Sequence, residues 1–102
     1  MEEIICEAIR SRISLHFNYR GGGCTVDPYC LGMNAEGEMV LLGYQRSGQA
    51  LPGTLGHGTG WVTFPVDKLS DLKSTEIPFL PDKPDPKKKE KIVEIICCAD
   101  GS

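Results

Sequence analysis

The stretch from residue 8 to residue 79 constrains the fold more than any other part of the chain, because it reads as one short helix followed by about five strands. Leu15, Phe17 and Tyr19 alternate with polar residues, which is the two-residue period of a strand with one buried face. Glycines follow at 21–23, and glycine adopts the positive φ angles of tight turns at little cost. The first two strands are therefore predicted to form a hairpin.

The segment before these strands predicts an amphipathic helix. Ile4, Ile5, Ala8 and Ile9 recur at helical spacing and form one apolar stripe. Acidic residues occupy the first turn and arginines the last, an order that complements the helix dipole. We expect this helix to cover one side of the strands.

Four strands are predicted after the first one. The second spans 24–33, and Pro28 in its middle marks an edge, a bend or a bulge because proline donates no backbone hydrogen bond. The third, 38–46, is apolar on both faces, so we expect it to be central and covered on both sides. The fourth spans 61–64, and a short last strand falls within 70–77. This order predicts a mainly β fold, a small closed barrel with an N-terminal helix and an added C-terminal helix.

The rest of the chain is interpreted as a linker and a tail. Prolines recur at every third residue from Pro78 to Pro84, so 80–86 are predicted to form a semi-rigid linker after a barrel domain at 1–79. Residues 87–102 are predicted to form a helical tail, because their apolar positions follow helical spacing. Their β-branched residues fit a strand as well, and that alternative stays open.

Composition argues against several classes of protein. The 102-residue chain has a formal net charge of −3, which disfavours bulk attraction to nucleic acid or to acidic membranes. No apolar run approaches the ~20 residues that cross a bilayer. Glu2 and Glu3 argue against a secretion signal. These features predict a cytoplasmic domain that does not contact the membrane.

The five cysteines have no Cys-x-x-Cys spacing, so neither a metal site nor a cofactor is predicted. They are Cys6, Cys24, Cys30, Cys97 and Cys98. We expect buried or half-buried free thiols in a reducing compartment. Adjacent cysteines cannot readily bond each other, and the role of Cys97 and Cys98 stays open.

Short motifs in this order resemble the WYL domain family. They are Ala8-Ile9, Phe17-Asn18-Tyr19, Val26-Asp27-Pro28-Tyr29, the run from Gly37 to Tyr44 and the run from Thr63 to Leu69. The resemblance covers Glu3 to Phe79 and implies an SH3-like or Sm-like barrel. Members of the family are mostly bacterial, usually lie beside a helix-turn-helix, and are thought to sense ligands, often nucleotides or nucleic acid, in transcriptional or defence regulation.

The chain departs from the pattern of this family at informative positions. The name-giving Trp-Tyr-Leu reads Met39-Val40-Leu41 here, and Cys24 or Thr25 stands where the family often has arginine. Lys68 keeps a positive charge at one position. The basic pocket of the family is thus largely missing, which weakens the inherited expectation of nucleotide or oligonucleotide binding. A helix-turn-helix is also lacking, so DNA recognition would need a partner.

Eight residues are candidates for binding a ligand, because aromatic rings beside cations can stack bases or other planar molecules. They are Tyr19, Arg20, Tyr29, Tyr44, Arg46, His57, Trp61 and Lys68. Packing of the same aromatic residues in the core is the competing interpretation.

The catalytic motifs that we sought are missing. His16 falls on a predicted strand and His57 in a glycine-rich segment, and 53–60 lacks the Lys-Ser/Thr ending of a phosphate loop. We therefore predict a non-enzymatic module that senses a small molecule or nucleotide and acts in regulation with a partner. One alternative is a barrel that binds single-stranded nucleic acid. Another is a protein-interaction adaptor whose C-terminal apolar face mediates homo-oligomer or partner contacts.

Overall fold

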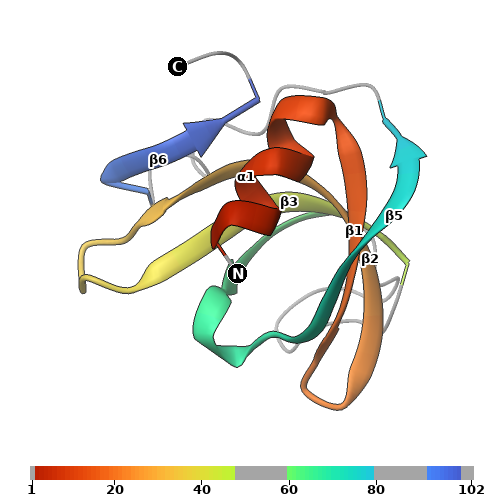
Figure 1. Cartoon of the computed structure of the whole chain (residues 1–102). Helices are drawn as coiled ribbons and strands as arrows, with labels where there is room; N and C mark the ends of the chain where they lie inside the picture. Colours follow the sequence, from red (N-terminus) through yellow and green to blue (C-terminus); the bar gives the residue numbers. More distant parts are fainter. Residues whose placement is uncertain (1, 48–59, 80–91, 100–102) are drawn as a thin grey trace.

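The computed structural model describes residues 2–47, 60–79 and 92–99, which form an antiparallel sheet with one helix (Figure 1). The elements are α1 (Glu2–Ser11), β1 (Ile13–Tyr19), β2 (Gly22–Met33), β3 (Met39–Ser47), β4 (Gly60–Pro65), the 3-10 helix η1 (Val66–Lys68), β5 (Ser70–Pro78) and β6 (Glu94–Cys98). The described fold is mainly β with an N-terminal helix, as predicted. The first five strands lie where the sequence placed them, with ends shifted by a residue or two.

The long strand β2 organises the sheet. One edge of β2 pairs with β3 along most of its length. Its other edge pairs first with β1 and then with β6. The strand order is β4-β3-β2-β1-β5, with β6 beside the second half of β2. β2 therefore forms backbone hydrogen bonds with three other strands.

The closed barrel predicted from the sequence is not confirmed. The path of paired strands begins at β4 and ends at β5, and in the described ranges these two strands do not pair. The chain passes from β4 to β5 through η1 rather than through a hairpin turn, so the two strands do not become hydrogen-bonded neighbours. The six described strands therefore form an open sheet.

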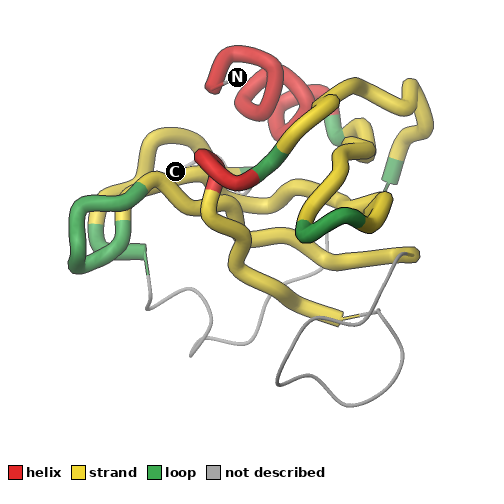
Figure 2. The backbone as a smooth tube through the Cα atoms, turned by 90° about the horizontal axis from the view of Figure 1, so that it is seen from below, coloured by secondary structure: helices red, strands yellow, loops and turns green. Residues whose placement is uncertain are grey.

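The main core lies between α1 and the sheet, and two views show the helix lying across one face (Figures 1 and 2). Ile5 and Ile9 are fully buried there, together with Phe17 of β1 and Phe64 of β4. Burial of each such side chain contributes roughly 2 kcal/mol. Ile4 is 45% exposed, so its place in the predicted apolar stripe is wrong. It lies about 100° around the helix from Ile5 and faces away from the sheet.

A second, smaller core lies on the opposite face of β3. Val40 and Leu42 belong to it together with Tyr29 and Ile92, whereas the intervening Leu41 belongs to the main core. The prediction that this strand is covered on both sides is therefore confirmed.

The predicted helical tail is wrong for Glu94–Cys98, which form strand β6 antiparallel to β2. Gly32 allows the close approach, because a Cβ at this position would collide with the backbone carbonyl of Glu94 and with Ile92. The open edge of β2 offers backbone hydrogen bonds, so tertiary pairing overrides the helical spacing. The predicted linker at 80–86 lies outside the described residues.

Four of the five cysteines form disulfide bonds, which corrects the expectation of free thiols. Cys6 of α1 bonds to Cys97, and Cys30 of β2 bonds to Cys98, with Cα–Cα distances of 5.9 and 4.1 Å. Successive strand residues face opposite sides, so the two adjacent cysteines attach β6 to both cores. Only Cys24 is free.

These bonds bear on where the protein resides. The predicted cytoplasmic location loses the support of reduced thiols and stays a prediction. Within the described part of the chain, no helix has the length and apolarity needed to cross a membrane.

The disulfide bonds should stabilise the fold strongly, because their cysteines are 91 and 68 residues apart in sequence. Chain entropy assigns about 4 kcal/mol to a loop of this size. The two contributions will not add fully, because both bonds fix the same strand. We expect the variant Cys97→Ser/Cys98→Ser to unfold roughly 20 °C lower than the wild type in a thermal melt.

Alkylation and mass spectrometry provide the control for this prediction. The denatured, unreduced chain should take up label at Cys24 alone, and reduction should expose all five cysteines. Labelling of all five without a reductant would show that the bonds do not form.

Candidate functional site

The structure separates the predicted ligand-binding residues into groups instead of lining one pocket with them. Three rings from β2, β3 and β4 make contact, and we call them the aromatic cluster: Tyr29, Tyr44 and Trp61. Arg46 lies against this cluster. The other four lie elsewhere: Tyr19 and Arg20 at the turn between β1 and β2, Lys68 exposed on η1, and His57 outside the described residues.

Trp61 lies at the centre of the aromatic cluster. Its ring centroid is 5.7 Å from that of Tyr29 and 5.5 Å from that of Tyr44, with interplanar angles of 87° and 83°. Edge-to-face contacts of this kind contribute about 1 kcal/mol each beyond the burial of area. Tyr29 is buried in the second core, whereas Tyr44 and Trp61 are half-buried. The second core therefore holds the cluster in place through Tyr29, while the rings of Tyr44 and Trp61 stay partly accessible.

A bulge in β2 sets the position of Tyr29. Pro28 pairs with Gly43 and Cys30 pairs with Leu42, so Tyr29 is the extra residue between them. Proline cannot donate to the ladder, and a bulge removes the need for that donor. The predicted bend or bulge at Pro28 is thus confirmed, and it re-aims Tyr29 toward Trp61.

Gly43 keeps β3 close to β2 beside the bulge. A Cβ on Gly43 would lie 2.5 Å from Cγ1 of Val26 and 2.9 Å from the carbonyl oxygen of Asp27. Any larger residue would push the strands apart, so the position of the neighbouring Tyr44 depends on this glycine.

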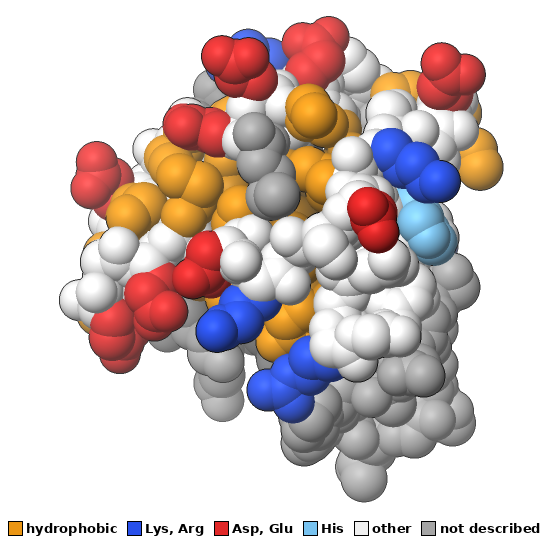
Figure 3. Space-filling view, turned by 60° about the horizontal axis from the view of Figure 1, so that its bottom comes forward, with side chains coloured by type: hydrophobic (Ala, Val, Ile, Leu, Met, Phe, Trp, Pro, Cys, Tyr) orange, Lys and Arg blue, Asp and Glu red, His pale blue; other side chains and the backbone are white. Residues whose placement is uncertain are grey.

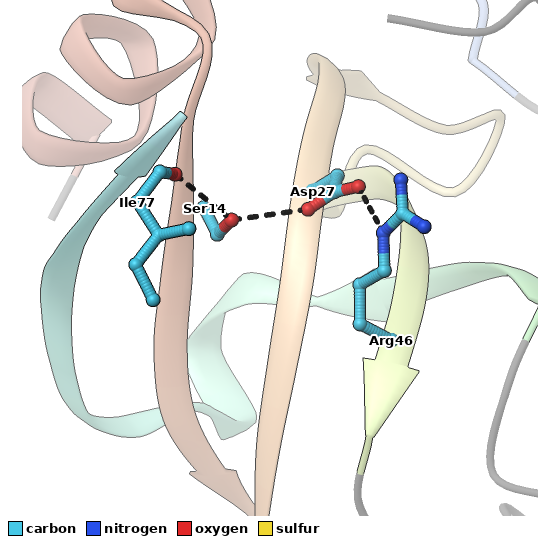
Figure 4. A network of polar contacts seen from close by, with 4 residues as sticks. All are labelled: Ser14, Asp27, Arg46 and Ile77. Carbon is cyan, nitrogen blue, oxygen red and sulfur yellow. Dashed lines mark hydrogen bonds and ion pairs between the residues drawn. The ribbon is translucent and has the colours of Figure 1, made fainter. Parts of the chain in front are cut away.

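Beside the cluster lies a buried carboxylate that the sequence analysis missed. Asp27 is 4% exposed, and its Oδ2 accepts a hydrogen bond from Nε of Arg46 at 2.5 Å (Figure 4). Oγ of Ser14 lies 3.1 Å from Asp27 Oδ1 and 3.2 Å from the carbonyl oxygen of Ile77, and its single proton serves one of them at a time. Asp27 is the one charged residue in β2, a signal that could have identified it.

Arg46 is held in place yet remains half-exposed. Its Cζ lies 5.1 Å from the ring centroid of Tyr44, and its side chain is 50% exposed. Nε donates to Asp27, and Figure 4 shows one terminal nitrogen on the side of that carboxylate and the other turned away from it. A guanidinium fixed in this way can offer parallel N–H donors to a carboxylate or a phosphate.

The second group belongs to the hairpin rather than to the aromatic cluster. The ring of Tyr19 packs edge-on against the buried Phe64 at 5.6 Å, which favours the core-packing interpretation for this tyrosine. Cζ of Arg20 lies 5.6 Å from the centroid of Tyr19. Arg20 and Gly21 both have positive φ angles, 54° and 79°, as a two-residue hairpin turn requires.

The free thiol of Cys24 is poorly placed for chemistry. It is 1% exposed, and Nε2 of Gln45 donates to its Sγ at 3.7 Å. Burial raises the pKa of the Cys24 thiol above its ordinary value of 9.0, so the reactive thiolate is scarce at neutral pH.

The other candidates for chemistry give no further site. Nδ1 of His16 contacts Oγ1 of Thr25 at 3.2 Å. In the ranges that the structure covers, no three His, Cys, Asp or Glu side chains are grouped to hold a metal ion.

Comparison with family models, with curated proteins and with solved structures gives no match for this chain.

The Asp27–Arg46 pair should respond unequally to loss of each partner. Arg46→Gln leaves a buried carboxylate with Ser14 alone and should lower the free energy of unfolding by about 2 kcal/mol. Asp27→Asn removes the charge but keeps an acceptor, and should cost about 1 kcal/mol. Urea denaturation of both variants and of the double variant measures this. The double variant should lose less than the sum, and strict additivity would show that the pair is not coupled.

Cys24 should make the stability depend on alkaline pH. Because its folded-state pKa is raised, the unfolded chain releases this proton at a lower pH than the folded chain. The resulting stability is fully present below the unfolded pKa and is lost as the pH rises above it. Between about pH 8 and about pH 10 the wild type should therefore lose more stability than Cys24→Ala. Parallel curves for the two proteins would contradict this assignment.

Proposed function

We propose that this protein is a non-enzymatic binding module whose ligand is a planar anion of the nucleotide class, held by the aromatic cluster and Arg46. One observation carries the proposal: two half-buried rings, Tyr44 and Trp61, lie beside an arginine that a buried carboxylate fixes in place. The rings would bind the base, and the terminal nitrogens of Arg46 would bind the anionic group.

The contacts set the expected strength of binding. Stacking of a base on an aromatic side chain contributes about 1–3 kcal/mol. Arg46 adds a charge-assisted hydrogen-bond pair to one phosphate or carboxylate. Its charge is partly offset by Asp27, so a ligand with one anionic group fits better than a highly charged chain. We expect a dissociation constant of about 0.1 mM.

The kinship with WYL domains and a regulatory role with a partner protein belong to the same proposal. Four of the five strand neighbours that a five-stranded barrel needs are paired: β1–β2, β2–β3, β3–β4 and β1–β5. The two remaining strands, β4 and β5, are joined by the short η1. This arrangement supports a divergent small barrel of the SH3-like or Sm-like type.

The single tryptophan makes the proposal directly testable, because its fluorescence reports on the site alone. Titration with adenosine monophosphate should quench Trp61 saturably. Adenosine should bind more weakly, and inorganic phosphate should change the signal little. Arg46→Gln should lower the affinity for adenosine monophosphate about tenfold and leave the affinity for adenosine unchanged. Arg20→Gln is the matched control, since it removes a guanidinium that also stacks on a tyrosine, and it should bind like the wild type.

Two results would overturn this assignment. The first is the lack of a saturable change with any of these probes. The second is an equal loss of nucleotide binding in Arg20→Gln and Arg46→Gln. Salt-dependent binding of a single-stranded oligonucleotide that needs both arginines would instead favour the nucleic-acid alternative.

A further inference from the structure

The outer face of α1 carries an apolar surface bordered by acids, formed by other elements than the aromatic cluster. Glu3, Ile4 and Glu7 are exposed on this face, and we call them the α1 ridge. A hollow of about 410 Å³ lies on one side of the ridge, with Ile4, Ala8 and Ile13 among its lining residues. A hollow of about 420 Å³ on the other side reaches Ile96 of β6 and is also lined by Arg10, so its lining is mixed in charge. Glu3 and Glu7 line both hollows.

The acidic charge of the ridge exceeds what the helix itself needs. Glu2 and Glu3 lie in the first turn, where carboxylates favour the helix dipole. Glu7 lies beyond that turn and four residues after Glu3, a spacing at which like charges destabilise a helix by a few tenths of a kcal/mol. Across the described ranges these glutamates form no ion pair, although Oγ of Ser11 donates to Glu7 at 3.3 Å. A cationic partner would relieve this repulsion.

Two apolar side chains of this surface are exposed in the described part of the chain. Ile4 is 45% exposed on the ridge and Ile96 is 37% exposed beside the second hollow. Figure 3 shows that hydrophobic side chains gather in patches on the visible face, with both acidic and basic side chains along their margins. The first hollow has a mostly apolar lining bordered by Glu3 and Glu7, and it is complementary to a segment that is apolar on one face and basic on the other.

We propose that the α1 ridge and its two hollows form a docking site for a basic amphipathic helix of a partner protein. Two cations of the partner, one helical turn apart, would face Glu3 and Glu7, which are also one turn apart. Aliphatic side chains of the partner would enter the hollows and cover Ile4. This is the helix-in-groove mode of recognition. It does not depend on the nucleotide site, because α1, β1, β5 and β6 form this surface, whereas β2, β3 and β4 carry the aromatic cluster.

A synthetic peptide tests the inference with the full-length chain. The probe is a labelled helical peptide of about 15 residues, with leucines on one face and lysines at positions i and i+4 beside them. Fluorescence anisotropy should show saturable binding that weakens at high salt. A peptide with glutamate in place of lysine, and one with serine in place of leucine, should both fail to bind.

Variants of the protein locate the contact. Glu7→Lys should lower the affinity for the lysine peptide about fivefold or more. Glu36→Lys is the matched control, because it makes the same charge change at an exposed position in the turn between β2 and β3, outside both hollows, and should leave binding unchanged. Ile4→Ser should weaken binding about tenfold without loss of the folded state, since Ile4 lies outside the core.

Several outcomes would overturn the proposal. Equal binding by Glu7→Lys and Glu36→Lys would show bulk attraction to an acidic protein rather than a site. Lack of peptide binding at low salt would remove the surface as a docking site for basic helices. A dimer by light scattering that Ile4→Ser dissociates would assign the face to a second copy of this chain. None of these results would affect nucleotide titration at Trp61.

Discussion

The fold depends on the pairing of β2, which among the described strands is the one hydrogen-bonded to three others. Its edge toward β3 is continuous, apart from two register shifts. Its other edge is shared, first by β1 and then by β6. Both cores include residues of β2, so side chains on both faces of this strand are buried. The late strand β6 completes the edge, and two disulfide bonds fix it there.

The candidate nucleotide site lies where this edge passes from β1 to β6. The last β1 partner in β2 is Val26 and the first β6 partner is Cys30. Pro28 lies between them, in a gap where a residue without a backbone donor does least harm. The bulge that accompanies it turns Tyr29 toward Trp61. Asp27 in the same gap is reached by Ser14 and Arg46 from the neighbouring strands. A local irregularity of the sheet thus brings aromatic, acidic and basic groups together.

The two proposed surfaces suggest a module that couples a small ligand to a partner. A fixed arginine beside aromatic rings in edge-to-face contact is suited to a ligand with one anionic group. The α1 ridge is suited to a protein segment because the hollow beside it has a mostly apolar lining bordered by Glu3 and Glu7, and because the main core supports the helix. β2 packs against α1 and carries Tyr29, so it joins the two surfaces physically. Coupling between them would require a second arrangement of this strand or its neighbours.

The sequence by itself determined the elements whose signals are local. The period of β1 placed Phe17 in the core, and glycines placed the first hairpin. Pro28 placed the bulge, and the continuous apolar run of β3 showed that both of its faces are covered. Four of the eight predicted ligand-binding residues do come together, namely Tyr29, Tyr44, Arg46 and Trp61.

Only the tertiary structure decided which distant residues share an edge or a core. It paired β6 with β2, so a segment with helical spacing became a strand and four cysteines met in two bonds. It placed Tyr19 against Phe64, away from the cluster contacts, and it set Asp27 beneath Arg46. Periodicity records which side of an element faces inward, whereas these contacts depend on the free energy of long-range pairing, which no local pattern encodes.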